Sequence, residues 1–144
     1  MSSEFAPARP LRFFIQEEKA SFMWALNQFK KNLDATQDSL KSLEGEKIVS
    51  SSDPELVVGV VQETPAEAVT PLIEMMESEL KDSFWSKSGL ILYRVAVMLK
   101  AADLMLLKRN ELCALIVYEA GKTWTEALGD VDEAIDFINF YARE

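Results

Sequence analysis

Hydrophobic residues recur at helical spacing in the first part of the chain. One apolar face of a helix is formed by Phe22, Leu26, Phe29 and Leu33. The spacing predicts a helix from about Gln16 to Leu33, with this face packed in the core. Residues 1–15 contain Pro7 and Pro10 and show no periodicity, so we expect an extended arm there. The polar stretch 35–43 is interpreted as a connection.

Short β-branched runs replace the helical spacing in the next part of the chain. They are Ile48-Val49 and Leu56–Val61, and the segment Ser50–Pro54 between them is rich in turn-forming residues. The pattern predicts a two-stranded hairpin. Because an isolated hairpin is only marginally stable in water, we expect it to lie on a sheet or on helices.

Helical spacing returns after the hairpin. The run Thr64-Pro65-Ala66-Glu67 predicts a capping box, with the proline at the first helical position, where its missing N–H costs nothing. Pro71 conflicts with this helix and predicts a kink or a restart. Met75 and Met76 are interpreted as gap-filling core residues rather than as part of a cofactor site. The apolar positions of the helix are Val69, Leu72, Ile73, Met76 and Leu80.

The next predicted helix is apolar nearly all round. It is expected to begin at a cap on Ser86 or Ser88 and to run to about Leu107. Its apolar positions are spread over several faces and include Leu92, Val95, Met98, Leu99, Ala102, Met105 and Leu106. A helix with this pattern is expected to be buried on most sides.

The last third of the chain is typical of a helix, a sharp stop and a second helix. The first helix ends at Gly121, which suits the left-handed position after a helix end. Thr123 and Glu126 predict a capping box for a helix that runs from Trp124 to the end of the chain. The core stripe of that helix is predicted at Val131, Ala134, Ile135, Ile138 and Tyr141 or Ala142. A neighbouring face carries Asp130, Glu133, Phe137, Phe140 and Glu144.

Composition narrows the classes of function. The chain has 24 Asp and Glu against 15 Lys and Arg, and its net charge of −9 argues against a nucleic-acid partner. It contains no histidine, which excludes a histidine-based triad or an imidazole metal site within this chain. No apolar run is long enough to predict a membrane span. The single cysteine and the absence of a secretory or transit signal favour a cytoplasmic location.

Few residues of the chain are candidates for chemistry. Cys113 lies on an apolar helix face and is interpreted as a small buried hydrophobe. No dinucleotide-binding, Walker or Cys-x-x-Cys motif occurs. Carboxylates on neighbouring turns of one helix rarely complete a coordination sphere, so metal binding is disfavoured at Asp130, Asp132, Glu133 and Asp136. We therefore predict no catalytic, cofactor-binding or metal-binding residue.

One motif near the end of the chain points to a family. It begins with Tyr118-Glu119-Ala120-Gly121-Lys122, followed by Trp124 and Glu126-Ala127, and this part resembles the aldehyde dehydrogenase superfamily. Its continuation, Asp130-Val131-x-Glu133-Ala134-Ile135-Asp136-Phe137 through Tyr141-Ala142-Arg143, is similar to the pyrroline-5-carboxylate (glutamate-semialdehyde) dehydrogenase branch. Those enzymes stand alone or form part of proline utilization A. The stretches 45–61 and 100–112 also resemble the superfamily.

The resemblance implies a fold that is mainly α with a small β-ribbon, the N-terminal helical portion of an α/β aldehyde dehydrogenase fold. Residues 16–144 would then form an incomplete part of the NAD-binding domain, after the arm of residues 1–15. It also implies oxidation of glutamate semialdehyde to glutamate with NAD in proline catabolism, through a thiohemiacetal, hydride transfer and thioester hydrolysis. The catalytic and cofactor-binding groups belong to later parts of such enzymes, so this chain alone is not expected to bind NAD.

Glu133 is the one residue for which the resemblance implies a ligand role. In pyrroline-5-carboxylate dehydrogenases the glutamate of this motif lies beside the substrate pocket, where a carboxylate can pair with the amino group of glutamate semialdehyde. Its place on one helix face with Phe137 and Phe140 is unusual for a carboxylate. The alternative is a solvated acid on a polar face, which is the commoner arrangement.

The apolar helices also predict a partner. We expect Val95, Leu99, Leu106 and the face of Phe137 and Phe140 to be covered by more polypeptide, either the rest of an enzyme or a second copy of the chain. The alternative function is a non-enzymatic helical interaction module derived from a truncated aldehyde dehydrogenase. Whether the natural reading frame continues past Glu144 would distinguish the two.

Overall fold

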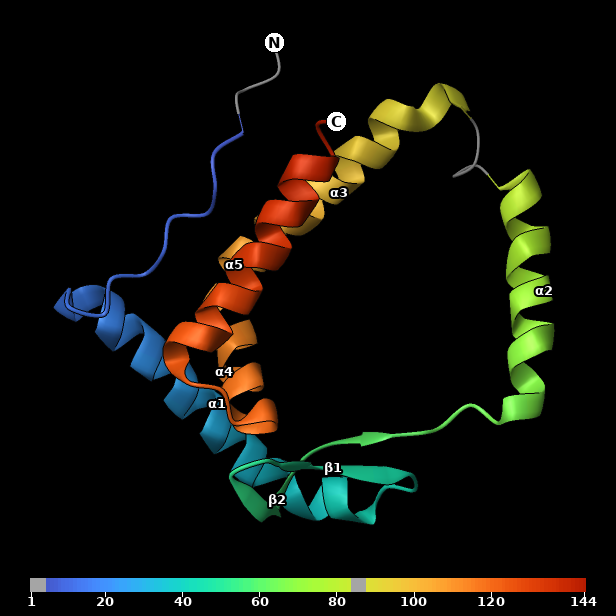
Figure 1. The fold of residues 1–144 in the computed structure, drawn as a ribbon. Coiled ribbons are helices and arrows are strands. Elements are labelled where there is room, and N and C mark those ends of the chain that lie inside the picture. The colour runs from blue at the N-terminus through green and yellow to red at the C-terminus, as the bar shows by residue number, and fades with distance from the viewer. Residues whose placement is uncertain (1–4, 84–87) are drawn as a thin grey trace.

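The computed structural model describes residues 5–83 and 88–144. Its elements follow the chain in the order shown in Figure 1, where helix α2 stands apart from the other helices. The elements are α1 (Gln16–Ser42), β1 (Glu46–Ser50), β2 (Asp53–Val61), α2 (Ala66–Asp82), the 3₁₀ turn η2 (Ser88–Leu90), α3 (Ile91–Leu107), α4 (Arg109–Ala120) and α5 (Trp124–Tyr141). The prediction of a mainly helical fold with a small ribbon is confirmed.

Helix α1 presents its predicted apolar face to the core, but it is longer than predicted. Phe29 stacks on Tyr118 of α4 at 5.6 Å between ring centroids, and the other three members of the face are buried. The predicted connection 35–43 is wrong, because the helix continues to Ser42. Gln37 explains the extension. Its side-chain amide donates to the Val57 carbonyl at 2.8 Å and accepts from the Val57 amide at 3.0 Å, so the polar stretch is held as a helix against β2.

Strands β1 and β2 form the predicted antiparallel hairpin. No other strand occurs in the described part of the chain. The turn is shorter than predicted, since Pro54 already belongs to β2. The pairing shifts between Ile48 and Val49, whose partners Gly59 and Val57 skip Val58. Such a bulge increases the local twist of the strands. The hairpin lies on α1 and α4, which agrees with the expected helical support.

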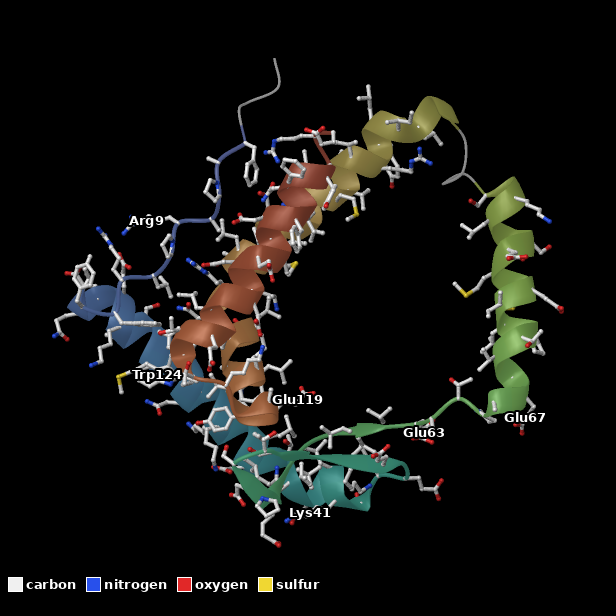
Figure 2. All side chains as sticks on the ribbon, viewed as in Figure 1. Arg9, Lys41, Glu63, Glu67, Glu119 and Trp124 are labelled. Atoms are coloured by element: carbon white, nitrogen blue, oxygen red, sulfur yellow. The ribbon has the colours of Figure 1, made fainter. Side chains whose placement is uncertain are left out.

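Helix α2 differs from the predictions at its cap and in its burial, and it shows no restart at Pro71. Its cap residue is Pro65, which has no side-chain oxygen, so the predicted capping box at Thr64 does not form. The helix passes through Pro71 without a restart, because a proline in the second turn deprives only the Glu67 carbonyl of its helical partner. Met75 and Met76 are exposed rather than packed, as are the other large apolar residues of α2. Figure 2 shows Glu67 in the first turn of α2, away from the other helices.

Helix α3 ends at Leu107 as predicted, but it begins later than predicted, at Ile91, and it lacks the predicted burial. Ser88 starts the short turn η2 instead of capping the helix, whose cap position is Leu90, and Ser86 lies outside the described residues. Of its residues only Ala102 is fully buried, while Leu92 is 83% exposed. The apolar residues all round α3 predict burial on most sides of the helix, but within this chain α3 packs mainly along α5 (Figure 1).

The core lies where α1, α3, α4 and α5 meet. Its buried members are Phe22, Leu26, Ala102, Cys113, Ala114, Ala127, Leu128, Val131 and Ile135. The predicted stripe of α5 is confirmed at Val131 and Ile135, whereas Tyr141 at its end is exposed. Ala8, Leu11 and Phe13 of the N-terminal arm pack against the same core. Among the described residues, no helix combines the length and the apolar character that a membrane span requires.

Candidate functional site

The corner between α4 and α5 sets the direction of the last helix. Gly121 adopts the predicted left-handed conformation, with φ 67° and ψ 19°, and its amide donates to the Val117 carbonyl at 3.1 Å. The predicted capping box follows. The Thr123 hydroxyl accepts from the Glu126 amide at 3.4 Å, and the Glu126 carboxylate accepts from the Thr123 amide at 2.9 Å. The Thr123 hydroxyl also donates to the Glu126 carboxylate at 2.7 Å, and this hydrogen bond, followed by the one from the Thr123 amide, lowers the pKa of Glu126.

The hairpin turn is anchored on this corner, which the sequence did not reveal. The Ser51 amide and hydroxyl both donate to the Glu119 carbonyl, at 3.1 and 2.8 Å. Figure 2 shows Glu119 at the end of α4, above the hairpin. A Cβ added to Gly121 would lie 3.2 Å from the Ser51 Cβ. The hairpin therefore supplies hydrogen bonds to a helix end whose carbonyl would otherwise lack a helical partner.

A buried ion pair joins the start of α4 to α5. Arg109 and Asp132 are in direct contact through Nη2 and Oδ2, and both side chains are largely buried. Arg109 Nε and Asp132 Oδ1 have no hydrogen-bond partner among the described residues. Burial raises the pKa of Asp132, although the guanidinium of Arg109 acts in the opposite direction. Sequence reasoning missed this pair, because Arg109 stands in the polar stretch Lys108–Glu111, where nothing marks it as buried.

The acidic residues of α5 have separate partners. Asp130 pairs with Lys122, Asp132 with Arg109, and an Asp136 oxygen accepts from the Ala8 amide at 2.7 Å. Three carboxylates of the predicted cluster are therefore engaged by three different groups. No set of three such side chains in the described ranges is arranged to hold a metal ion.

Glu133 differs from these neighbours. It is exposed, and it makes no hydrogen bond or ion pair with any residue that the structure describes. The adjacent aromatic rings are also accessible, since Phe137 is 53% exposed and its ring lies 6.1 Å from that of Tyr141. Phe140 contacts the same tyrosine edge-on at 5.3 Å. Glu133 is thus an exposed carboxylate on a helix face that also carries exposed aromatic rings, which agrees with the implied ligand role and equally with the alternative of a solvated acid.

Cys113 is not a candidate nucleophile. Its side chain is fully buried, and its Sγ lies 3.6 Å from the Ala127 carbonyl oxygen, which it can approach as a weak donor. Burial raises the pKa of the thiol to about 11. Since the thiolate is the reactive form, this environment suppresses nucleophilic chemistry. The interpretation of Cys113 as a small buried hydrophobe is confirmed.

The two glycines with positive φ serve the fold of the chain itself. The glycines with positive φ are Gly45 and Gly121, and the space beside each is filled by the chain itself. A Cβ on Gly45 would lie 2.6 Å from the Val61 carbonyl oxygen, and the corresponding neighbour of Gly121 is Ser51. A phosphate-binding loop needs glycines that let a ligand approach the backbone. Neither of these two glycines leaves room for a phosphate beside its backbone.

Comparison with known proteins defines the class. Residues 41–144 match the aldehyde dehydrogenase family, and the chain belongs to that family. Its relatives include 1-pyrroline-5-carboxylate dehydrogenase of Staphylococcus aureus strain MW2, which is 31% identical over 152 residues. That match covers 99% of this chain and 28% of the relative, so the chain spans about 28% of the relative's length. The predicted resemblance to this branch is confirmed.

Solved structures agree with the sequence match. Proline utilization A from Bdellovibrio bacteriovorus, inactivated by N-propargylglycine, superposes with a TM-score of 0.79 and 28% identity, covering 97% of this chain and 15% of that one. A 1-pyrroline-5-carboxylate dehydrogenase from Thermus with bound NAD gives a TM-score of 0.73 and 29% identity, covering 99% and 28%. At these identities and scores, the chain has the fold of the matched portion of such proteins.

Proposed function

We propose that this chain is part of an NAD-dependent 1-pyrroline-5-carboxylate dehydrogenase of proline catabolism, which oxidises glutamate semialdehyde to glutamate. The names of its relatives and its membership of the aldehyde dehydrogenase family support this activity. The nucleophile, the general base and the NAD site would lie in other parts of the polypeptide. The one cysteine of this chain, Cys113, is buried and its thiol pKa is raised, so it does not supply the nucleophile. A cytoplasmic location is part of the proposal, in keeping with the one buried free cysteine.

The role proposed for this chain rests on Glu133. A substrate with an ammonium group needs an accessible anion, and Glu133 is the carboxylate of the α5 acidic cluster that is not engaged by another described residue. The aromatic rings beside it offer a surface of low polarity, where a charge-assisted hydrogen bond is stronger than in open water. Helix α5 is held by its capping box and by the Arg109–Asp132 pair. Glu133 would therefore meet the ammonium group from a fixed helix.

Replacing Glu133 with Ala in the complete enzyme is expected to raise KM for glutamate semialdehyde about 10- to 150-fold, which corresponds to ~1.5–3 kcal/mol for a lost charged hydrogen bond. The KM for propanal, which has no ammonium group, should change little. Steady-state kinetics with both aldehydes measures the difference. Glu133→Gln should show most of the loss, because the amide keeps the shape but not the charge.

Glu111→Ala is the matched control for this experiment. Glu111 is an exposed acid in the first turn of α4, so its removal changes the net charge equally without touching α5. It should leave both KM values unchanged. Equal changes for the two aldehydes in Glu133→Ala would show that Glu133 does not bind the ammonium group.

The exposed apolar surface supports a larger assembly. Large apolar side chains of α2 and α3 face solvent in this chain, and Leu107 at the end of α3 is 80% exposed. Large exposed apolar side chains gathered on one helix often mark an interface. We propose that the remainder of an aldehyde dehydrogenase polypeptide covers it, including Leu106 and the Phe137 and Phe140 face predicted above.

The chain of 144 residues should accordingly bind the dye 1-anilinonaphthalene-8-sulfonate and associate with itself, whereas the complete enzyme should bind much less dye per chain. Dye fluorescence and sedimentation velocity measure the two properties. A stable dimer without dye binding would make a second copy the partner. A monomer that binds no dye would contradict the proposed interface and favour a self-sufficient helical module.

A further inference from the structure

The N-terminal arm is attached to α5 at two points. The Ala8 amide donates to Asp136 Oδ1 at 2.7 Å, and the Phe5 ring contacts Phe140 edge-on, with 5.7 Å between centroids and an interplanar angle of 84°. Figure 1 shows the arm running beside α5 before it turns into α1. Phe5 and Ala8 therefore contact residues far along the sequence. These contacts hold the arm in place although it forms no helix or strand.

The other end of the arm is fixed on α1. Glu18 accepts from the Arg12 amide at 2.6 Å, from Arg12 Nη2 at 2.9 Å and from Arg9 Nη2 at 2.6 Å. The hydrogen bonds from Arg12 lower the pKa of the Glu18 carboxyl. Leu11 and Phe13, on either side of Arg12 in the sequence, pack against the core. The arm therefore bridges α1 and α5 with a carboxylate at each end.

The contacts of the arm with α5 lie at the Glu133 face, which is the exposed side of α5 formed by Glu133, Phe137 and Phe140. Asp136 and Phe140 follow Glu133 by three and seven residues. At about 100° per residue they project roughly 60° and 20° from Glu133 around the helix axis. Both residues that contact the arm therefore lie on the same side of α5 as Glu133. Phe137 projects about 40° from Glu133 in the opposite direction around the helix axis, so Glu133 lies between Phe137 and the arm contacts.

We propose that Asp136 docks the arm on α5, and that the docked arm, through Phe5, forms one border of the Glu133 face and restricts which aldehydes reach it. Asp136 acts here as a positioning residue: its Oδ1 is used by the arm rather than by a substrate. The first half of the proposal concerns this chain alone. The second half rests on the proposed dehydrogenase function.

Hydrogen exchange on the 144-residue chain tests the docking. Asp136→Ala should remove the protection of the Ala8 amide, while Asp136→Asn should keep most of it, because an amide oxygen still accepts from Ala8. Asp130→Asn is the matched control, since Asp130 is a carboxylate of the same helix that pairs with Lys122 instead of the arm. Protection of the α5 amides in every variant shows that the helix remains folded. Unchanged Ala8 protection in Asp136→Ala would overturn the docking.

Kinetics on the complete enzyme tests the border. Phe5→Ala should lower the ratio of kcat/KM for glutamate semialdehyde to that for propanal by about 2- to 12-fold, the range expected for one aromatic pair. Asp136→Ala should produce a change in the same direction, and Asp136→Asn should restore most of the ratio. Normal selectivity in Phe5→Ala together with loss of Ala8 protection in Asp136→Ala would overturn the border and leave the docking standing. A failure of the dehydrogenase proposal would instead appear in Glu133→Ala, and would not affect the exchange result.

Discussion

Arg109→Met is expected to destabilise the chain by about 3–5 kcal/mol at pH 8, since it removes one partner of a buried ion pair. The guanidinium of Arg109 contacts the Asp132 carboxylate between α4 and α5, where both side chains are largely excluded from water. Methionine fills much of the same volume, so the loss comes mainly from the charge left behind. Urea unfolding followed by circular dichroism measures the change.

The effect of this substitution should depend on pH. Burial already raises the pKa of Asp132 with Arg109 present, and without the guanidinium the folded-state pKa must rise further. A carboxyl whose pKa is raised in the folded state favours folding in its protonated form. Stability therefore falls as pH rises from the unfolded-state pKa through the higher folded-state pKa. The variant should lose less stability at pH 5 than at pH 8.

The double variant Arg109→Met, Asp132→Leu distinguishes the attraction within the ion pair from the cost of burying a single unpaired charge. If the cost arises from an unpaired buried charge, replacing both partners with apolar side chains should recover most of the stability. Arg109 Nε and Asp132 Oδ1, which have no hydrogen-bond partner among the described residues, favour this outcome. A double variant as unstable as Arg109→Met would show that the pair itself, with its geometry, holds α4 against α5.

Gly121→Val is expected to destabilise the chain by about 2–5 kcal/mol, which combines ~1–3 for the strained backbone with about 1 for each Ser51 hydrogen bond lost. Gly121 has φ 67°, a conformation that is especially unfavourable for a β-branched residue. Its new Cβ would lie 3.2 Å from the Ser51 Cβ and would push the hairpin away from the Glu119 carbonyl.

Gly129→Val is the matched control for the corner. Gly129 lies within α5 and a Cβ there would meet nothing within 4 Å, so valine should change stability by less than about 0.5 kcal/mol. Ser51→Ala, which keeps the backbone hydrogen bond, isolates the hydroxyl contribution. Equal destabilisation by Gly121→Val and Gly129→Val would mean that the left-handed corner is not the source of the effect.

Local features of this chain were predictable from its sequence. The left-handed Gly121, the capping box of Thr123 and Glu126, and the apolar stripes of α1 and α5 all depend on residues within a few positions of each other. Such interactions depend little on the rest of the fold. The motif that resembles the aldehyde dehydrogenases lies over the same corner, which is why family and helix ends were recognised together.

Contacts between distant segments required the tertiary structure. Arg109 and Asp132 are 23 residues apart, Ser51 and Glu119 are 68 apart, and Ala8 and Asp136 are 128 apart. No periodicity marks such partners in advance. The extension of α1 through a polar stretch has the same origin, because Gln37 is held by the backbone of β2.

The burial of apolar side chains shows most clearly what the sequence determines and what only the tertiary structure decides. The apolar patterns of α2 and α3 determined that these segments are helices, and they predicted burial for both. In this chain most of their large apolar side chains face solvent. The sequence determines where a helix has apolar surface, because that depends on residue type and helical period. Only the tertiary structure decides whether that surface is covered, because covering it requires another segment to lie against it.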